Sequence, residues 1–177
     1  SGTAQETPTT TVQATTGTTT KATTKTTTKP TTKTTTVSSL YKTFTEGKIS
    51  FQLPSHYKKA ADSSPIMYVP ETYPQVGDNF NLVVMPKDPT FDSLTEDLFS
   101  EQMETLFPGL VVEEFKKTKV AGKSAYRTTY TVSMEGISVT ITQVIIDADN
   151  TYTLTYSMFN GDLADHVEKC IQSISFK

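Results

Sequence analysis

The sequence predicts an α+β domain over residues 38–177, with a largely antiparallel β-sheet of about six to seven strands that is covered by helices. Two observations predict this fold. Four segments in the second half of the chain are rich in valine, isoleucine, threonine and tyrosine, and only short turns separate them. Two other segments, one before these strands and one after them, place apolar residues at helical spacing. Because short turns join antiparallel neighbours, we expect one antiparallel sheet with helical cover.

The folded part begins with a predicted β-hairpin. Residues 40–44 and 49–53 each alternate apolar and polar side chains, which is typical of a strand with one buried face. Gly47 lies in the turn between them, and Pro54 ends the second strand. Two further short strands are expected, at 66–69 and 80–85.

A helix is predicted to follow these strands. Ser93 and Glu96 have the spacing of a capping box, in which a hydroxyl and a carboxylate satisfy free amides at a helix start. The apolar residues behind them share one helical stripe: Leu94, Leu98, Phe99, Met103, Leu106 and Phe107. Pro108 and Gly109 end the helix.

Four strands in series come next, and a closing helix follows them. The strands are expected at 110–119, 124–135, 137–147 and 151–159. Gly122, Gly136 and the pair Asp149 and Asn150 supply the turns. The closing helix is expected to open near Asp162 and to pack on the sheet through one stripe: Leu163, Val167, Cys170, Ile171 and Ile174.

Residues 1–37 differ sharply in composition from the rest of the chain. Twenty of them are threonine, and lysines recur every four positions at Lys21, Lys25, Lys29 and Lys33. The segment has almost no large apolar side chains, so burial cannot offset the entropy of ordering its backbone, about 1 to 2 kcal/mol per residue. We therefore predict a disordered linker or stalk at 1–37 and a single folded domain at 38–177.

Charge and composition exclude several classes of partner. The predicted domain holds 12 basic and 18 acidic residues, and an acidic domain is a poor partner for nucleic acid or anionic lipid. The lone Cys170 excludes an intramolecular disulfide, and no apolar run approaches the length of about 20 residues that spans a bilayer. We expect a monomer that meets a membrane only through a lipid anchor upstream of Ser1.

Four segments resemble the PsbP-like family, whose sandwich fold also occurs in a small Ran-GTPase-binding protein of yeast. These segments are residues 47–54, 79–86, 150–156 and 171–176, which read GKISFQLP, NFNLVVMP, NTYTLTY and IQSISF. Where such families place a tryptophan soon after the opening proline, this chain has Tyr57. The resemblance implies the fold and a role as an extrinsic subunit, binding protein or secreted lipoprotein. It carries no functional residue over to this chain.

No catalytic, cofactor-binding or metal-binding residues are predicted. His56 and His166 fall in unrelated segments and do not begin a metal-binding spacing, so both are expected to be surface histidines. Cys170 lies on the apolar stripe of the closing helix, where a cysteine is usually a small buried hydrophobe. Asp147 and Asp149 are interpreted as turn residues rather than calcium ligands, because the spacing of a calcium loop is absent.

The predicted interaction surface is the loop between the strands at 66–69 and 80–85. It combines aromatic and stiff residues, which supply contact area at a small entropy cost. The candidate residues are Tyr57, Tyr68, Tyr73, Pro74 and Val76. The alternative is that the tyrosines close the end of the core.

These observations favour a non-catalytic extracytoplasmic domain, held at a bacterial cell surface by its threonine-rich tether, that binds another protein or a surface polymer. The second interpretation is a small-molecule binding or enzymatic module with a pocket between helix and sheet. The tether itself has two interpretations, the stalk of a lipoprotein or a linker within a larger secreted protein. A tether raises the local concentration near a surface and suits all of these.

Overall fold

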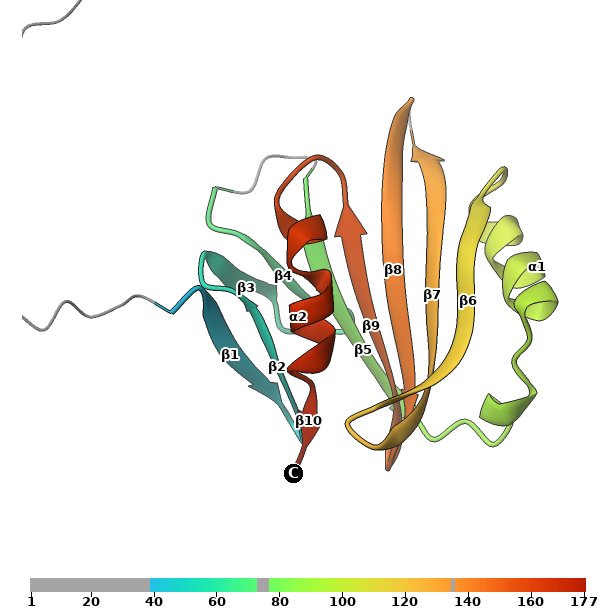
Figure 1. The fold of residues 1–177 in the computed structure, drawn as a ribbon, viewed down its shortest axis with the longest axis horizontal. Helices are drawn as coiled ribbons and strands as arrows, with labels where there is room; N and C mark the ends of the chain where they lie inside the picture. The colour runs from blue at the N-terminus through green and yellow to red at the C-terminus, as the bar shows by residue number, and fades with distance from the viewer. Residues whose placement is uncertain (1–38, 73–76, 135) are drawn as a thin grey trace, which may run out of the picture. The chain divides into compact units, whose positions relative to one another are not determined.

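The structure is a computed structural model that describes residues 39–72, 77–134 and 136–177. The described domain consists of a three-stranded sheet, a seven-stranded sheet and two short α-helices (Figure 1). The small sheet has the order β1-β2-β10, with β1 at Tyr41–Glu46, β2 at Ile49–Pro54 and β10 at Ser175–Phe176. The prediction of an α+β fold with mostly antiparallel strands is confirmed.

The large sheet is antiparallel throughout and has the order β3-β4-β5-β9-β8-β7-β6. Its strands are β3 (Tyr57–Ala61), β4 (Ile66–Pro70), β5 (Asn79–Pro86), β6 (Val111–Val120), β7 (Lys123–Met134), β8 (Ile137–Asp147) and β9 (Asn150–Met158). The helical segments are η1 (Phe91–Ser93), α1 (Glu96–Leu106), η2 (Leu163–Asp165) and α2 (Val167–Gln172). None of the described helices has the length and apolar character needed to cross a membrane.

Both faces of the large sheet are covered, and β8 shows why. Val139 and Ile141 point to one face, whereas Val144 and Ile146 point to the other, because successive side chains of a strand alternate. All four side chains are buried. The strand therefore needs an apolar partner on each side.

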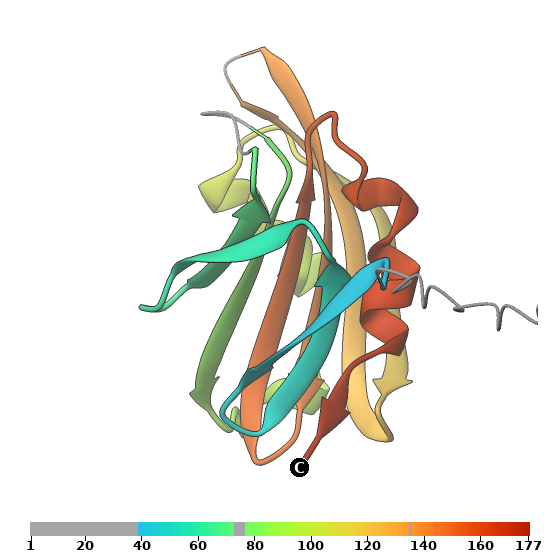
Figure 2. The same ribbon diagram turned by 90° about the vertical axis from the view of Figure 1, so that its left-hand side faces the viewer.

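The small sheet and α2 cover one face of the large sheet, and α1 covers part of the other (Figures 1 and 2). On the first face, Phe51 of β2 and Cys170 of α2 are completely buried against the sheet, together with Leu154 of β9. On the second face, Phe99 of α1 packs against β7, with its ring 5.7 Å from that of Tyr130. The domain thus has two cores that share one sheet.

The structure adds a three-stranded sheet to the predicted antiparallel sheet. The hairpin of β1 and β2 pairs with β10 and lies on the face of the large sheet, because Ile49, Phe51 and Leu53 bury their side chains there. Strand β10 was not predicted, since a two-residue strand has no periodicity to detect.

Strand β3 also differs from the prediction, because no strand was expected between Pro54 and residue 66. The turn occupies Ser55 and His56, but a strand follows it. Tyr57 is buried, whereas Lys58 and Lys59 are exposed at the edge of the sheet, so the strand lacks an apolar alternation. The opposite edge strand, β6, also carries lysines: Lys116, Lys117 and Lys119.

The boundaries of both helices differ from the prediction. Thr95, not Ser93, is the N-cap of α1, and its hydroxyl accepts a hydrogen bond from the amide of Leu98 at 3.3 Å. Ser93 instead ends the turn η1. The closing helix is split into η2 and α2, so the segment between Asp162 and Val167 bends rather than continuing as one helix.

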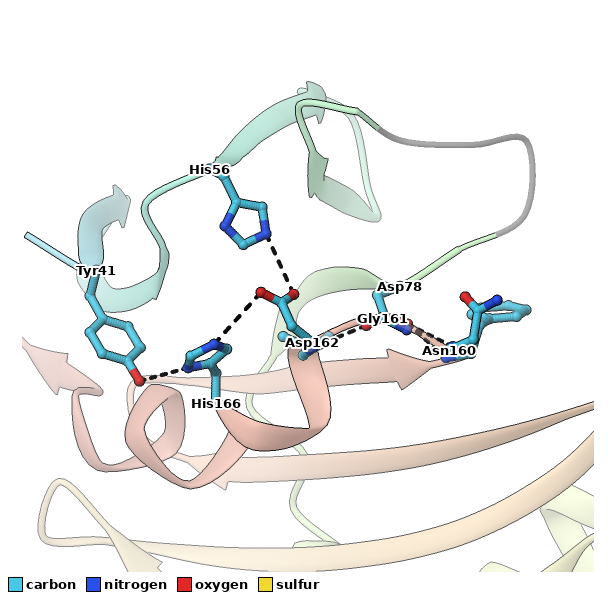
Figure 3. Close-up of polar contacts among 9 residues, drawn as sticks. Tyr41, His56, Asp78, Asn160, Gly161, Asp162 and His166 are labelled. Carbon is cyan, nitrogen blue, oxygen red and sulfur yellow. Dashed lines mark hydrogen bonds and ion pairs between the residues drawn. The ribbon is translucent and has the colours of Figure 1, made fainter.

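Asp78 holds the segment that follows β9. Its carboxylate is buried and accepts four backbone amide hydrogen bonds (Figure 3). The donors are Phe159 at 2.8 Å, Asn160 at 3.3 Å, Gly161 at 3.1 Å and Leu163 at 3.0 Å. Four such bonds offset the cost of burying the charge.

Gly161 allows this close approach. A Cβ atom added at Gly161 would lie 2.3 Å from Oδ2 of Asp78, closer than any van der Waals contact permits. Glycine is therefore required here by space and not by its backbone angles.

We expect Asp78→Asn to lower the free energy of unfolding by about 2 kcal/mol. The asparagine amide would place a donor opposite a backbone amide that now donates to Asp78, so at least one buried donor would lose its acceptor. Urea denaturation measures the change, with Asp165→Asn as a control because Asp165 is exposed and carries the same charge. Equal effects of the two substitutions would contradict a special role of Asp78.

Candidate functional site

The predicted interaction surface falls partly in the core. Tyr57 is 1% exposed and Tyr68 is completely buried, so neither side chain is available to a partner. This corrects their assignment to a surface and agrees with the alternative that these tyrosines close the end of the core. Tyr73, Pro74 and Val76 lie outside the described residues, and their role stays a prediction.

The surroundings of Tyr68 explain its burial. Its ring centroid lies 4.6 Å from that of Phe44 and 5.6 Å from that of Phe51, both in the small sheet. Its hydroxyl donates a hydrogen bond to the carboxylate of Glu46, at the end of β1. Burial raises the pKa of Tyr68, and the bond to Glu46 raises it further. Tyr68 therefore joins the two sheets.

Tyr57 is close enough to Asp78 and Asp162, which line an open cleft, to feel their charges. Burial raises the pKa of its hydroxyl, and the charges of Asp78 and Asp162 raise it further. This cleft has a volume of about 210 Å³ and is lined by both polar and apolar atoms. The side chains that give it polar character are those of His56, Thr72, Asp78, Asn160 and Asp162.

Two carboxylates in this cleft have different surroundings. Asp78 is buried and its oxygens are occupied by backbone amides. The Asp162 side chain is 50% exposed, and two imidazole nitrogens lie near it, His56 Nε2 at 3.5 Å and His166 Nε2 at 3.7 Å. Both distances are longer than a normal hydrogen bond. Asp162 can therefore accept hydrogen bonds from a partner, whereas the hydrogen bonds of Asp78 stabilise the fold.

His166 also contacts the first strand of the domain. Its Nδ1 lies 2.8 Å from the hydroxyl of Tyr41 in β1, and the two rings meet edge to face with centroids 5.5 Å apart. Figure 3 shows the resulting row of side chains, from Tyr41 through His166 and Asp162 to His56. These residues come from β1, the junction between η2 and α2, the segment before η2, and the β2–β3 turn.

The sequence did not predict this cluster. His56 and His166 were expected to be unrelated surface histidines, and both are indeed partly exposed. They converge on one carboxylate only because η2 folds back beside the β2–β3 turn. Since 110 positions separate them, no local spacing indicated the contact.

The cluster has the order hydroxyl, imidazole, carboxylate that activates nucleophiles in some enzymes. Its geometry is poor for that chemistry, because 3.7 Å separates His166 Nε2 from Asp162 Oδ2. Within the described ranges, no three histidine, cysteine, aspartate or glutamate side chains are placed to hold a metal ion. The arrangement is better suited to linking β1 and the β2–β3 turn to the residues around η2, and to presenting polar groups in the cleft.

Two other clefts compete as candidate sites. One, of about 330 Å³, lies by the turns of the β1–β2 and β8–β9 hairpins, where Lys48 and Asp149 form an ion pair at 2.7 Å. Hydrogen bonding within this pair raises the pKa of Lys48 and lowers that of Asp149, so these charges already satisfy one another. The other, of about 470 Å³, separates α1 from β6 and carries three glutamates, Glu96, Glu101 and Glu104. An acidic rim alone does not indicate a ligand.

Cys170 is predicted to be chemically inert in the folded protein. Its side chain is completely buried, and burial raises the pKa of the thiol to about 12, so the reactive thiolate is scarce at neutral pH. We expect a thiol reagent at pH 8 to modify the unfolded protein at least about 100-fold faster than the native one. Rapid labelling of the native protein, followed by mass spectrometry, would contradict this expectation.

Comparison with solved structures identifies the fold. No protein-family model and no curated protein matches the chain. LpqN of Mycobacterium tuberculosis, which is involved in cell envelope biogenesis, matches with a TM-score of 0.57 and 13% sequence identity, over 77% of this chain and 90% of LpqN. The PsbP protein of Synechocystis sp. PCC 6803, CyanoP, matches with a TM-score of 0.57 and 11% identity, over 80% of this chain and 96% of CyanoP.

At such low identities the likeness concerns the fold. It agrees with the resemblance of residues 47–54, 79–86, 150–156 and 171–176 to the PsbP-like family. The described domain therefore has the PsbP-like fold that LpqN and CyanoP share.

Proposed function

We propose that this chain is a non-catalytic binding or assembly domain that works outside the cytoplasm at a bacterial cell surface. In this proposal it binds another protein or a surface polymer, and residues 1–37 are the tether. The observation that carries it is the open cleft beside the β2–β3 turn, in which the half-exposed carboxylate of Asp162 can still accept hydrogen bonds. The fold shared with LpqN, which is involved in cell envelope biogenesis, supports the location.

The chemistry of the cleft suggests what it binds. Its exposed polar groups include the hydroxyl of Thr72, the amide of Asn160 and the carboxylate of Asp162, and no lysine or arginine is among its described lining residues. Such a surface favours a partner that presents hydrogen-bond donors, such as peptide amides or sugar hydroxyls, over an anionic partner. An acidic domain disfavours nucleic acid for the same reason.

The rival interpretation requires a pocket between a helix and the sheet. In the described domain, the space between α2 and the large sheet is filled by side chains. Val167 and Cys170 of the helix and Tyr156 of the sheet are all buried there. This packing favours binding at the surface over binding in an interior pocket.

The double substitution Thr72→Ala/Asn160→Ala is expected to reduce partner capture at least about tenfold, the effect of losing about 1.4 kcal/mol of binding free energy. Both side chains are exposed in the cleft, and truncation leaves the backbone amides that bind Asp78 in place. The measurement is a cross-linking pull-down from intact source cells with the full chain as bait. Tyr73→Ala, in the same experiment, tests the part of the predicted surface outside the described residues.

A matched control for the pull-down is Gln102→Ala/Thr105→Ala, which truncates two exposed polar side chains of α1, on the other face of the sheet. Equal capture by the cleft variant and the control would exclude the cleft as the binding surface. Absence of any partner above background would favour the rival small-molecule module, which a ligand-induced rise in Tm would then support.

Lipid anchoring gives a separate expectation for the natural protein. If a lipid precedes Ser1, the protein extracted from its source cells should enter the detergent phase of a phase-separated extract, because one or two acyl chains dominate its partitioning. Recovery in the aqueous phase alone would instead favour the linker of a larger secreted protein.

A further inference from the structure

The free edge of β1 differs from the other sheet edges of the described domain. Strand β1 pairs only with β2 among the described strands, and it lies at the outer side of the domain, toward the viewer in Figure 2. The two edges of the large sheet carry lysines, and the other edge of the small sheet, β10, has only two residues. Charged side chains and short strands both oppose pairing with another chain. Strand β1 has six residues, a single lysine and no proline, so it is the least protected of these edges.

The backbone groups of Thr43 and Thr45 point away from β2. Thr43 lies opposite Gln52, whose amide donates to Oγ of Ser173 at 2.7 Å and therefore faces away from β1. Opposite residues of an antiparallel pair either face each other or both face away, so Thr43 also faces away from β2. Because this direction alternates along a strand, Thr45 faces the same way. The N–H and C=O groups of both threonines are therefore directed outward at the edge.

Two opposite charges flank Phe44 at equal spacing along β1. Lys42 is exposed, and among the described residues it has no ion pair. Glu46 contacts Tyr68 and Lys59, but both contacts are made by Oε1, and the side chain is 17% exposed. Its second oxygen, Oε2, takes part in no ion pair within the described domain and can accept a further donor.

We propose that the β1 strands of two copies of this chain pair antiparallel about a two-fold axis at Phe44. In this register Thr43 of each copy lies opposite Thr45 of the other, so every outward N–H of these threonines finds a C=O acceptor. The same register places Lys42 opposite Glu46 on both sides of the axis, and opposite charges stabilise a cross-strand pair. Moving the axis to Thr43 or Thr45 would place Lys42 opposite Phe44 or Lys48 and would lose both ion pairs.

This pairing makes the protein a dimer rather than the monomer that its composition led us to expect. It joins two three-stranded sheets into one, and the two-fold symmetry closes the assembly because each copy has one such edge. Only one short strand of each copy takes part, so we expect a weak dimer with a Kd of about 10 to 100 µM. The pairing uses no residue of the cleft at Asp162 and is independent of the binding function proposed above.

The test measures the mass of the full chain by sedimentation equilibrium at concentrations from about 5 µM to about 1 mM. Thr43→Pro removes an N–H that the domain itself does not use, so it should leave the fold intact. It should weaken the dimer at least about 100-fold, because the N–H is lost on both sides of the axis and the ring blocks close approach. Thr43→Val is the matched control, since it keeps the amide and the branched shape, and it should dimerise like the parent chain.

Two further measurements test the register. Lys42→Glu places like charges opposite each other on both sides of the axis, and it should weaken the dimer about tenfold. In a mixture of differently labelled chains, an isotope-filtered NOE should connect Hα of Lys42 in one copy with Hα of Glu46 in the other. Within one strand these two residues lie about 13 Å apart, so the contact can arise only between copies.

Several outcomes would overturn the pairing. One is a chain that stays monomeric up to about 1 mM. Another is a monomer whose β1 amides become protected only when a protein captured from the source cells is added, which would assign this edge to that protein. A dimer that survives Thr43→Pro, or that lacks the contact between Lys42 and Glu46, would place the interface elsewhere. If Thr43→Pro does not fold, Lys42→Glu at the exposed position provides the comparison, and an unchanged Kd would contradict the proposal.

Discussion

The hydrogen bonding of the Asp78 carboxylate determines how the end of the chain meets the sheet. A buried carboxylate that accepts four amides fixes the backbone of the residues between β9 and η2. That segment sets the direction of η2, and η2 places both Asp162 and the start of α2. The cleft, the histidine pair and the contact of α2 with the sheet therefore all depend on one side chain. Gly161 is also required for these hydrogen bonds, because a larger residue at this position would collide with the carboxylate.

The second constraint is that the central strands are apolar on both faces. A sheet with neither face exposed to water requires two covering layers. The chain supplies one layer from the two ends of the domain and the other from its middle. The small sheet combines the first two strands with the last, so residues near both ends of the domain share one layer. Helix α1, from the middle of the chain, covers the other face. The cluster at Asp162 lies where the first strand and the last helix meet, which explains why it links segments so distant in sequence.

Local features of the sequence were sufficient to predict most of the fold. The meander of β6 to β9 follows from β-rich segments and from turns at Gly122, Gly136 and Asp149. Features that depend on distant neighbours were not predictable. Strand β3 carries polar side chains because it is an edge strand, and β10 forms only because β2 is beside it. Thr95 and Ser93 are both good capping residues, but Ser93 ends η1 and Thr95 caps α1. The resemblance to the PsbP-like family gave the overall architecture but no residues for a site.

The candidate site was the least predictable part, for a physical reason. Composition indicates that tyrosines are available for contact, but only packing decides whether a tyrosine such as Tyr68 is exposed. Conversely, His56 and His166 have no pattern in sequence and acquire a common partner only through the path of the chain around Asp162. Polar contacts between distant segments have no periodicity, so a structure is needed to find them.

The lysines at the two edges of the large sheet bear on how copies of this domain behave beside one another. An unprotected edge strand offers free backbone groups to any similar strand that it meets, and charged side chains oppose that pairing. Lys58 and Lys59 occupy one edge, while Lys116, Lys117 and Lys119 occupy the other. Two copies that approached through these edges would have to remove these charged side chains from water, together with Glu113 and Glu114 of β6. Dense crowding of such domains on a surface is thereby compatible with each remaining a separate folded unit.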